Sequence, residues 1–151
     1  VIQSLVEWLD PEVPHSGSAP LSETLERVRH AVRPGSLVIV ISDFFNLDES
    51  CHRHVSRLRQ HNDVIGCQVI DPAEELLPPG RFPITDGDSS TMLDTTRQSA
   101  RRRFDDMSHH HLVEPKRLFL KHKCGWLVMR THDDPVDLLG RELRILVGRA
   151  A

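Results

Sequence analysis

The sequence predicts an α/β domain built on a partial doubly wound sheet of about three parallel strands, with flanking helices and a small β-hairpin insertion. Three apolar runs, at residues 37–41, 63–71 and 125–131, are typical of strands buried in a parallel sheet. Helical apolar patterns lie between these runs, and a strand, helix, strand succession favours a right-handed parallel crossover. A length of 151 residues suits a single domain with a sizeable core.

Composition narrows the classes of partner and compartment. The net charge of -3 argues against a general nucleic-acid binder, which would normally carry a basic face. No apolar run approaches the roughly 18 residues of a membrane-spanning helix, and we expect no signal peptide within this segment. Cys51, Cys67 and Cys124 are far apart and form no CxxC pair, which fits reduced thiols. We therefore expect a cytoplasmic domain without nucleic-acid or membrane partners in this segment.

The N-terminal region predicts two helices separated by a linker. The chain begins without methionine inside a helical apolar stripe at residues 1–9, which suggests that residues 1–151 form one truncated domain of a longer protein. Residues 11–20 contain three prolines and are expected to be a Pro/Gly/Ser linker. Pro20 suits the first turn of the next helix, whose apolar face consists of Leu21, Leu25, Val28 and Val32.

The segment after the first strand predicts a helix, a strand and a hairpin. Asp48 is placed to cap a helix that aligns Cys51, Val55 and Leu58. The strand at 63–71 follows. Turn residues then flank two short β-type runs at 82–85 and 91–93, which predicts that residues 72–94 form a hairpin insertion; the turn signals are at 78–80 and 86–88.

The C-terminal third predicts a helix in two segments, a strand and a final helix. Thr95-x-x-Gln98 resembles a capping box and would open the first segment. Pro115 would start the second segment, which reaches about Lys121. After the strand at 125–131, Asp134-Pro135 is a typical helix start.

Carboxylates occur where strands end, and ligands of parallel sheets usually bind beyond those ends. Asp43 follows the first strand directly, so it could hold a hard cation or attack phosphorus, but it could equally cap a turn. Asp71 and Asp133 follow the other two strands. If all three gathered, they would predict a metal-dependent phosphate-ester hydrolase.

Other reaction centres have less support in the sequence. The consecutive histidines His109, His110 and His111 would spread around a helix, so solvated side chains are favoured over a zinc site. No GxSxG, GxxxxGK[ST] or GxGxxG motif is present. A phosphoacceptor role for Asp43 ranks last, since an acidic pair and a downstream lysine are missing.

Four motifs in a fixed order resemble a known bacterial family. They are Ser42-Asp43, Asp71-Pro72-Ala73-Glu74, Leu77-Pro78-Pro79-Gly80 and Leu93-Asp94-Thr95. Together they are similar to the C-terminal part of the MoxR-associated von Willebrand factor A-like family, over roughly residues 17–147. The resemblance implies a Rossmannoid, von Willebrand factor A-like sheet.

The resemblance also implies a degenerate metal-ion-dependent adhesion site. In that fold, an Asp-x-Ser-x-Ser loop, a Thr and an Asp that ends the fourth strand hold the cation. Asp43 corresponds to the last Asp, whereas the Thr position reads Ala19, with Ser18 adjacent and Ser22 one turn later. The Asp-x-Ser-x-Ser loop would precede Val1. A single carboxylate binds a cation weakly, so no cofactor is expected here, and Mg²⁺ only if the upstream loop exists.

The function implied by the resemblance is non-catalytic protein–protein interaction, with a MoxR-type AAA+ ATPase as partner in assembly, maturation or stress response. Phe44, Phe45 and Asn46 are the predicted partner-binding residues, because two consecutive aromatics make a plausible anchor, although either could be core. The first strand of the fold would be missing, which makes residues 37–41 a sheet edge. The N-terminal helix, the hairpin or a second copy of the chain would cover that edge.

Overall fold

The computed structural model describes residues 20–45, 47–85 and 90–148. The predicted helix at 1–9, nearly all of the 11–20 linker, Ser18, Asn46 and the turn at 86–88 lie outside these residues.

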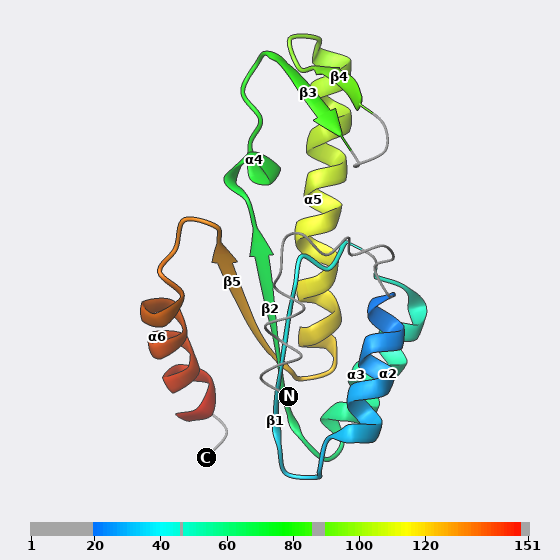
Figure 1. The fold of residues 1–151 in the computed structure, drawn as a ribbon, viewed down its shortest axis with the longest axis vertical. Helices are drawn as coiled ribbons and strands as arrows, with labels where there is room; N and C mark the ends of the chain where they lie inside the picture. Colours follow the sequence, from blue (N-terminus) through cyan, green and yellow to red (C-terminus); the bar gives the residue numbers. More distant parts are fainter. Residues whose placement is uncertain (1–19, 46, 86–89, 149–151) are drawn as a thin grey trace, which may run out of the picture.

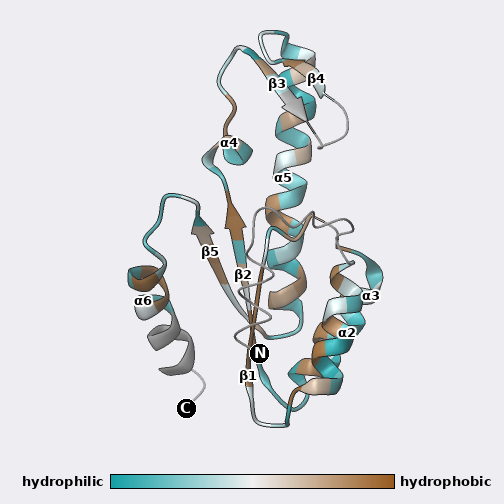
Figure 2. Ribbon diagram, viewed as in Figure 1, coloured by the Kyte–Doolittle hydropathy of each residue, from teal (hydrophilic) through white to brown (hydrophobic). Residues whose placement is uncertain are grey.

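The central sheet contains three parallel strands in the order β1 (Leu37–Ser42), β2 (Asp63–Ile70) and β5 (Gly125–Arg130) (Figure 1). The register pairs Leu37 with Asp63 and Ile65 with Gly125. The strands β1 and β2 are strongly hydrophobic (Figure 2). The predicted α/β class with three parallel strands is confirmed.

Helices lie on both faces of this sheet, as the doubly wound prediction requires. Three helices pack into one hydrophobic core with β1 and β2: α2 (Leu21–Ala31), α3 (Glu49–Arg59) and α5 (Gln98–Lys121). On the opposite face, α6 (Pro135–Gly148) contributes Leu139 to a smaller cluster with Ile65, Cys67 and Leu127. Figure 1 shows α6 beside β5 and apart from the other three helices.

Strand β1 forms one edge of the sheet within the described residues. Its Val38 is buried, but Leu37 and Ile41 are 47% and 57% exposed. The expectation that this strand is covered on both faces is therefore wrong for the described part of the chain. The predicted edge position agrees with the sheet order, and a homodimer through this edge stays a prediction.

A cluster of three aromatic rings fills the space between β2 and the C-terminal half of α5. Phe44 lies 5.4 Å from Phe119 and 5.5 Å from Trp126, measured between ring centroids. Gly66, in the middle of β2, makes room for these rings, because a Cβ there would lie 2.8 Å from the Trp126 ring. Such close approach explains why glycine occupies the interior of this strand.

The hairpin insertion follows β2 and a short helix, α4 (Pro72–Glu75). Strands β3 (Arg81–Thr85) and β4 (Ser90–Asp94) pair antiparallel, which confirms the predicted hairpin. Thr95 closes its base. The Thr95 hydroxyl donates to the Pro78 carbonyl (2.7 Å) and accepts from the Gly80 N–H (2.9 Å).

Two sequence expectations about α5 are wrong. Thr95 does not cap the helix, because its hydroxyl is used within the hairpin base; the N-cap is Arg97, which makes no side-chain capping bond. Pro115 does not start a new segment, because α5 continues through it as one helix of 24 residues. By contrast, the predicted cap at Asp48 is confirmed, since its carboxylate accepts from the Cys51 N–H at 2.9 Å.

Candidate protein-binding groove

The loop after β1 sends two consecutive aromatic side chains in opposite directions. The Ser42 hydroxyl accepts from the Phe44 N–H (3.0 Å), and Asp43 Oδ1 accepts from the Phe45 N–H (3.1 Å). Phe44 has a φ of 59°, a left-handed backbone conformation that costs a bulky residue energy. This turn leaves Phe44 2% exposed and Phe45 69% exposed.

Of the two alternatives left open for Phe44, partner anchor or core, the structure shows a core side chain. Its ring belongs to the aromatic cluster with Phe119 and Trp126, where the burial of apolar surface stabilises the fold. Phe45 is accessible, so its partner-binding role stays a prediction. Asn46 lies outside the described residues.

Gln68 links the β1 loop to α5. Its side chain is only 1% exposed, and its Nε2 donates to the His111 carbonyl (3.1 Å) and, more weakly, to the Asp43 carbonyl (3.4 Å). In a regular helix the N–H of residue 115 would bind the His111 carbonyl, but proline has no N–H. Gln68 satisfies the acceptor that Pro115 leaves free, which explains how α5 continues past a proline.

The short helix α4 is fixed at its start by Asp71. The Asp71 carboxylate accepts from the Ala73 N–H (2.8 Å) and from the Thr131 hydroxyl (3.0 Å). These two bonds, in that order, lower the pKa of Asp71. Glu74 completes a capping box by accepting from the Asp71 N–H.

Glu75, at the end of α4, forms a bidentate ion pair with the Arg130 guanidinium, with both N–O distances 2.9 Å. This hydrogen-bonded pairing lowers the pKa of Glu75 and raises that of Arg130. Helix α4 is thus joined to the C-terminal end of β5 as well as to β2.

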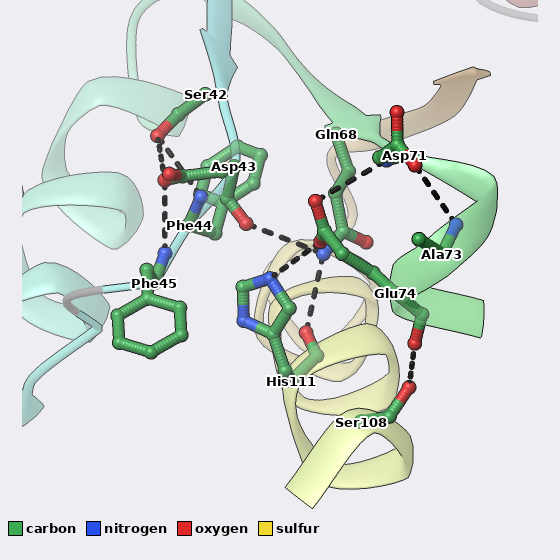
Figure 3. A network of polar contacts seen from close by, with 10 residues as sticks. All are labelled: Ser42, Asp43, Phe44, Phe45, Gln68, Asp71, Ala73, Glu74, Ser108 and His111. Carbon is green, nitrogen blue, oxygen red and sulfur yellow. Dashed lines mark hydrogen bonds and ion pairs between the residues drawn. The ribbon is translucent and has the colours of Figure 1, made fainter. Parts of the chain in front are cut away.

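Contacts between α4 and α5 complete a connected network (Figure 3). The Ser108 hydroxyl donates to the Glu74 carbonyl. His111 Nε2 lies 3.5 Å from Glu74 Oε2, and the His111 ring lies 5.2 Å from the Phe45 ring. The β1 loop, α4 and the middle of α5 are therefore held at fixed positions around one surface.

That surface is a groove with a volume of about 670 Å³ at the C-terminal end of β1. It combines apolar side chains from the loop and from α5 with carboxylates, and its lining has no lysine or arginine within the part of the chain that the structure describes. Met107 is 69% exposed there. The lining residues are Asp43, Phe44, Phe45, Leu47, Glu74, Phe104, Asp106, Met107, Ser108, His110, His111, Glu114 and Pro115.

Of the residues predicted for an adhesion-type metal site, the two that the structure describes, Ser22 and Asp43, do not converge. The Ser22 hydroxyl donates to Asp48 Oδ2 (2.8 Å), which lowers the pKa of Asp48, instead of approaching Asp43. Ser18 lies outside the described residues. Asp43 is engaged by Phe45. The side chains described here do not fit a Mg²⁺ site, and Mg²⁺ binding that depends on an upstream loop stays a prediction.

Asp43, Asp71 and Asp133 do not gather into one group either. Within the described ranges, no three His, Cys, Asp or Glu side chains form a group that could hold a metal. Each carboxylate has a local partner: Asp43 accepts from Phe45, Asp71 caps α4, and Asp133 Oδ2 accepts from the Arg130 N–H (2.7 Å). These turn-forming bonds hold the carboxylates at their own strand ends.

Comparison with known families shows to which family the chain belongs. The family model described as "Protein of unknown function DUF58" matches residues 1–114. The chain belongs to the DUF58 family. The matched region of this DUF58 chain includes the β1 loop, α4 and most of the α5 residues that line the groove. No curated protein matches the chain.

A solved structure supports the fold of this DUF58 chain. The conserved hypothetical protein BatB from Bacteroides thetaiotaomicron is similar, with a TM-score of 0.50 at 10% sequence identity. The match covers 99% of this chain and 69% of the BatB chain. At this identity the likeness concerns the fold alone, and it agrees with the predicted von Willebrand factor A-like, partial doubly wound sheet.

Sequence reasoning missed the residues that organise the groove, notably Gln68, Glu74 and His111. One signal was present in the sequence, although Pro115 was predicted to start a helical segment. A proline inside a helix leaves a free carbonyl four residues earlier, and a buried glutamine can supply the donor. No sequence pattern indicated that Met107 would line an open groove. In the described helices, none is long and apolar enough to span a membrane.

Proposed function

We propose that this DUF58 chain is a non-catalytic protein–protein interaction domain that binds a partner in the groove beside α5. The observation that carries the proposal is the exposure of apolar side chains, above all Phe45 and Met107, in a groove whose walls are fixed by hydrogen bonds. Exposed apolar surface in a preformed groove is typical of partner-binding sites.

The partner we propose is a MoxR-type AAA+ ATPase, in the context of assembly, maturation or stress response. Support for this choice comes from the similarity of four motifs in this chain to the MoxR-associated family. Three of those motifs, Ser42-Asp43, Asp71–Glu74 and Leu93–Thr95, contribute to the β1 loop, to α4 and to the hairpin base. A cytoplasmic site of action would suit such a partner and the three buried free thiols.

Binding of a purified MoxR-type ATPase from the same organism tests the proposal. Phe45→Ala and Met107→Ala should each weaken binding by more than about 1 kcal/mol, as interface anchors do. Leu120→Ala is a matched control, because Leu120 is also exposed on α5 but does not line the groove. Equal affinity of the wild type and all three variants would refute the proposal, with circular dichroism confirming that each variant is folded.

A further inference from the structure

We infer that the groove selects a basic amphipathic segment of its partner, in which lysine or arginine flanks apolar side chains. This inference deepens the proposed function and rests on it. It specifies the chemistry of the bound segment, which the resemblance to a family does not supply.

Charge complementarity carries the inference. Among the described residues, four carboxylates line the groove, from Asp43, Glu74, Asp106 and Glu114, and no lysine or arginine does. Asp106 and Asp43 are exposed, so their charges act on any ligand that enters. A negative lining attracts a cationic segment and repels an acidic one.

The lining also includes exposed apolar side chains, which determine the second property of the ligand. Phe45 and Met107 are both 69% exposed, and they approach the groove from the β1 loop and from α5, respectively. A purely hydrophilic basic peptide would leave this surface in contact with water. A segment with apolar side chains on one face would bury it, as amphipathic helices do when they bind in grooves.

Two of the four carboxylates lie beside a basic side chain of this chain, which identifies the residues to change. Glu74 lies near His111, and Glu114 lies 3.5 Å from the exposed Arg117. Asp106 and Asp43 are the better probes. Asparagine at position 43 keeps the oxygen that accepts the Phe45 N–H and removes only the charge.

Fluorescence anisotropy with two labelled model peptides tests the inference on the full chain. The peptides are amphipathic helices of about 14 residues with identical leucine faces, one with lysine and the other with glutamate on the polar face. We expect the lysine peptide to bind at least about tenfold more tightly. Its affinity should fall as salt is raised from 0.05 to 0.5 M, since exposed charges are screened.

Charge variants test whether the lysine peptide binds in the groove or elsewhere on the surface. Asp106→Asn and Asp43→Asn should each raise the Kd of the lysine peptide about two- to fivefold, the range expected for one exposed charge pair. Asp105→Asn is the matched control, because Asp105 is the exposed neighbour of Asp106 on α5 but does not line the groove. It should leave the Kd unchanged.

Three outcomes would overturn the inference: equal or tighter binding of the glutamate peptide, an equal effect of Asp105→Asn and Asp106→Asn, or self-association that Asp106→Asn abolishes. The last would assign the groove to a second copy of the chain. Failure of the proposed function is distinguishable. If Phe45→Ala and Met107→Ala weaken ATPase binding but the charge variants do not, the interaction role stands and only the basic-segment inference is lost.

Discussion

The two halves of α5 share one continuous helix but have different surroundings. In the C-terminal half, Pro115, Leu118 and Phe119 are buried against the sheet. In the N-terminal half, residues 101–103 and 105–107 are exposed, and this half extends beyond the sheet toward the hairpin (Figure 1). One half therefore stabilises the domain, whereas the other displays side chains.

The difference shows how a helix can expose side chains to solvent without a core of its own beneath them. Helical segments of this length are marginally stable when isolated. The exposed half continues a helix that is already packed, so it avoids the cost of nucleation. The Ser108–Glu74 bond and the Gln68–His111 bond then fix it near its midpoint. The groove lies next to these two bonds.

The largest expected contrast comes from truncating one apolar side chain in each half. Phe119→Ala should lower the free energy of unfolding by about 3–5 kcal/mol, because it removes a buried ring and leaves a cavity. Met107→Ala should change it by less than about 0.5 kcal/mol, because Met107 is exposed. Urea denaturation measures both, and similar losses in the two variants would show that the halves are not energetically distinct.

Removal of the hydrogen bond from Gln68 to the His111 carbonyl, near the middle of α5, should have an intermediate effect on the free energy of unfolding. Gln68→Leu should cost about 1–3 kcal/mol, because the His111 carbonyl would lose its donor while the site stays buried. In a Pro115→Ala background the new N–H can bind that carbonyl, so the same change should cost about 1 kcal/mol less. Strict additivity in this double-mutant cycle would contradict the compensating role of Gln68.

A smaller, local effect is expected from Ser108→Ala. The loss of its bond to the Glu74 carbonyl should reduce overall stability by about 0.5–1 kcal/mol. Hydrogen exchange should become faster at the amides of residues 98–108 but not at those of residues 116–121. Ser56→Ala on α3 serves as a control, and uniform acceleration along all of α5 would argue against a separately held N-terminal half.

The smallest effect expected is a pH dependence at the α4 junction. The pKa values of Asp71 and Glu75 are lowered in the folded chain by the Ala73 N–H and by Arg130, respectively. Such groups stabilise the fold above their unfolded pKa values of about 4, and this contribution is lost as the pH falls further, through their lowered folded pKa values. Unfolding curves between pH 7 and 3 should therefore show a shallower acid loss for Asp71→Asn and Glu75→Gln. Slopes identical to that of the wild type would contradict this.

Sequence patterns predicted the three strands, the hairpin and the Asp48 cap because these depend on local rules: apolar runs, turn residues and capping side chains. The roles of Phe44 and Phe45 could not be separated in this way. Both are phenylalanines in one loop, and only the left-handed backbone at Phe44 decides which ring enters the core.

The sequence by itself determined the α/β class, the order of the elements and the presence of carboxylates at strand ends, since each follows from nearest-neighbour chemistry. The tertiary structure alone decided that those carboxylates serve separate turns, that Gln68 completes a helix 43 residues away, and that Met107 and Phe45 share a groove. These outcomes depend on which backbone groups and side chains remain unsatisfied once the elements pack. No local sequence pattern predicts which groups these will be.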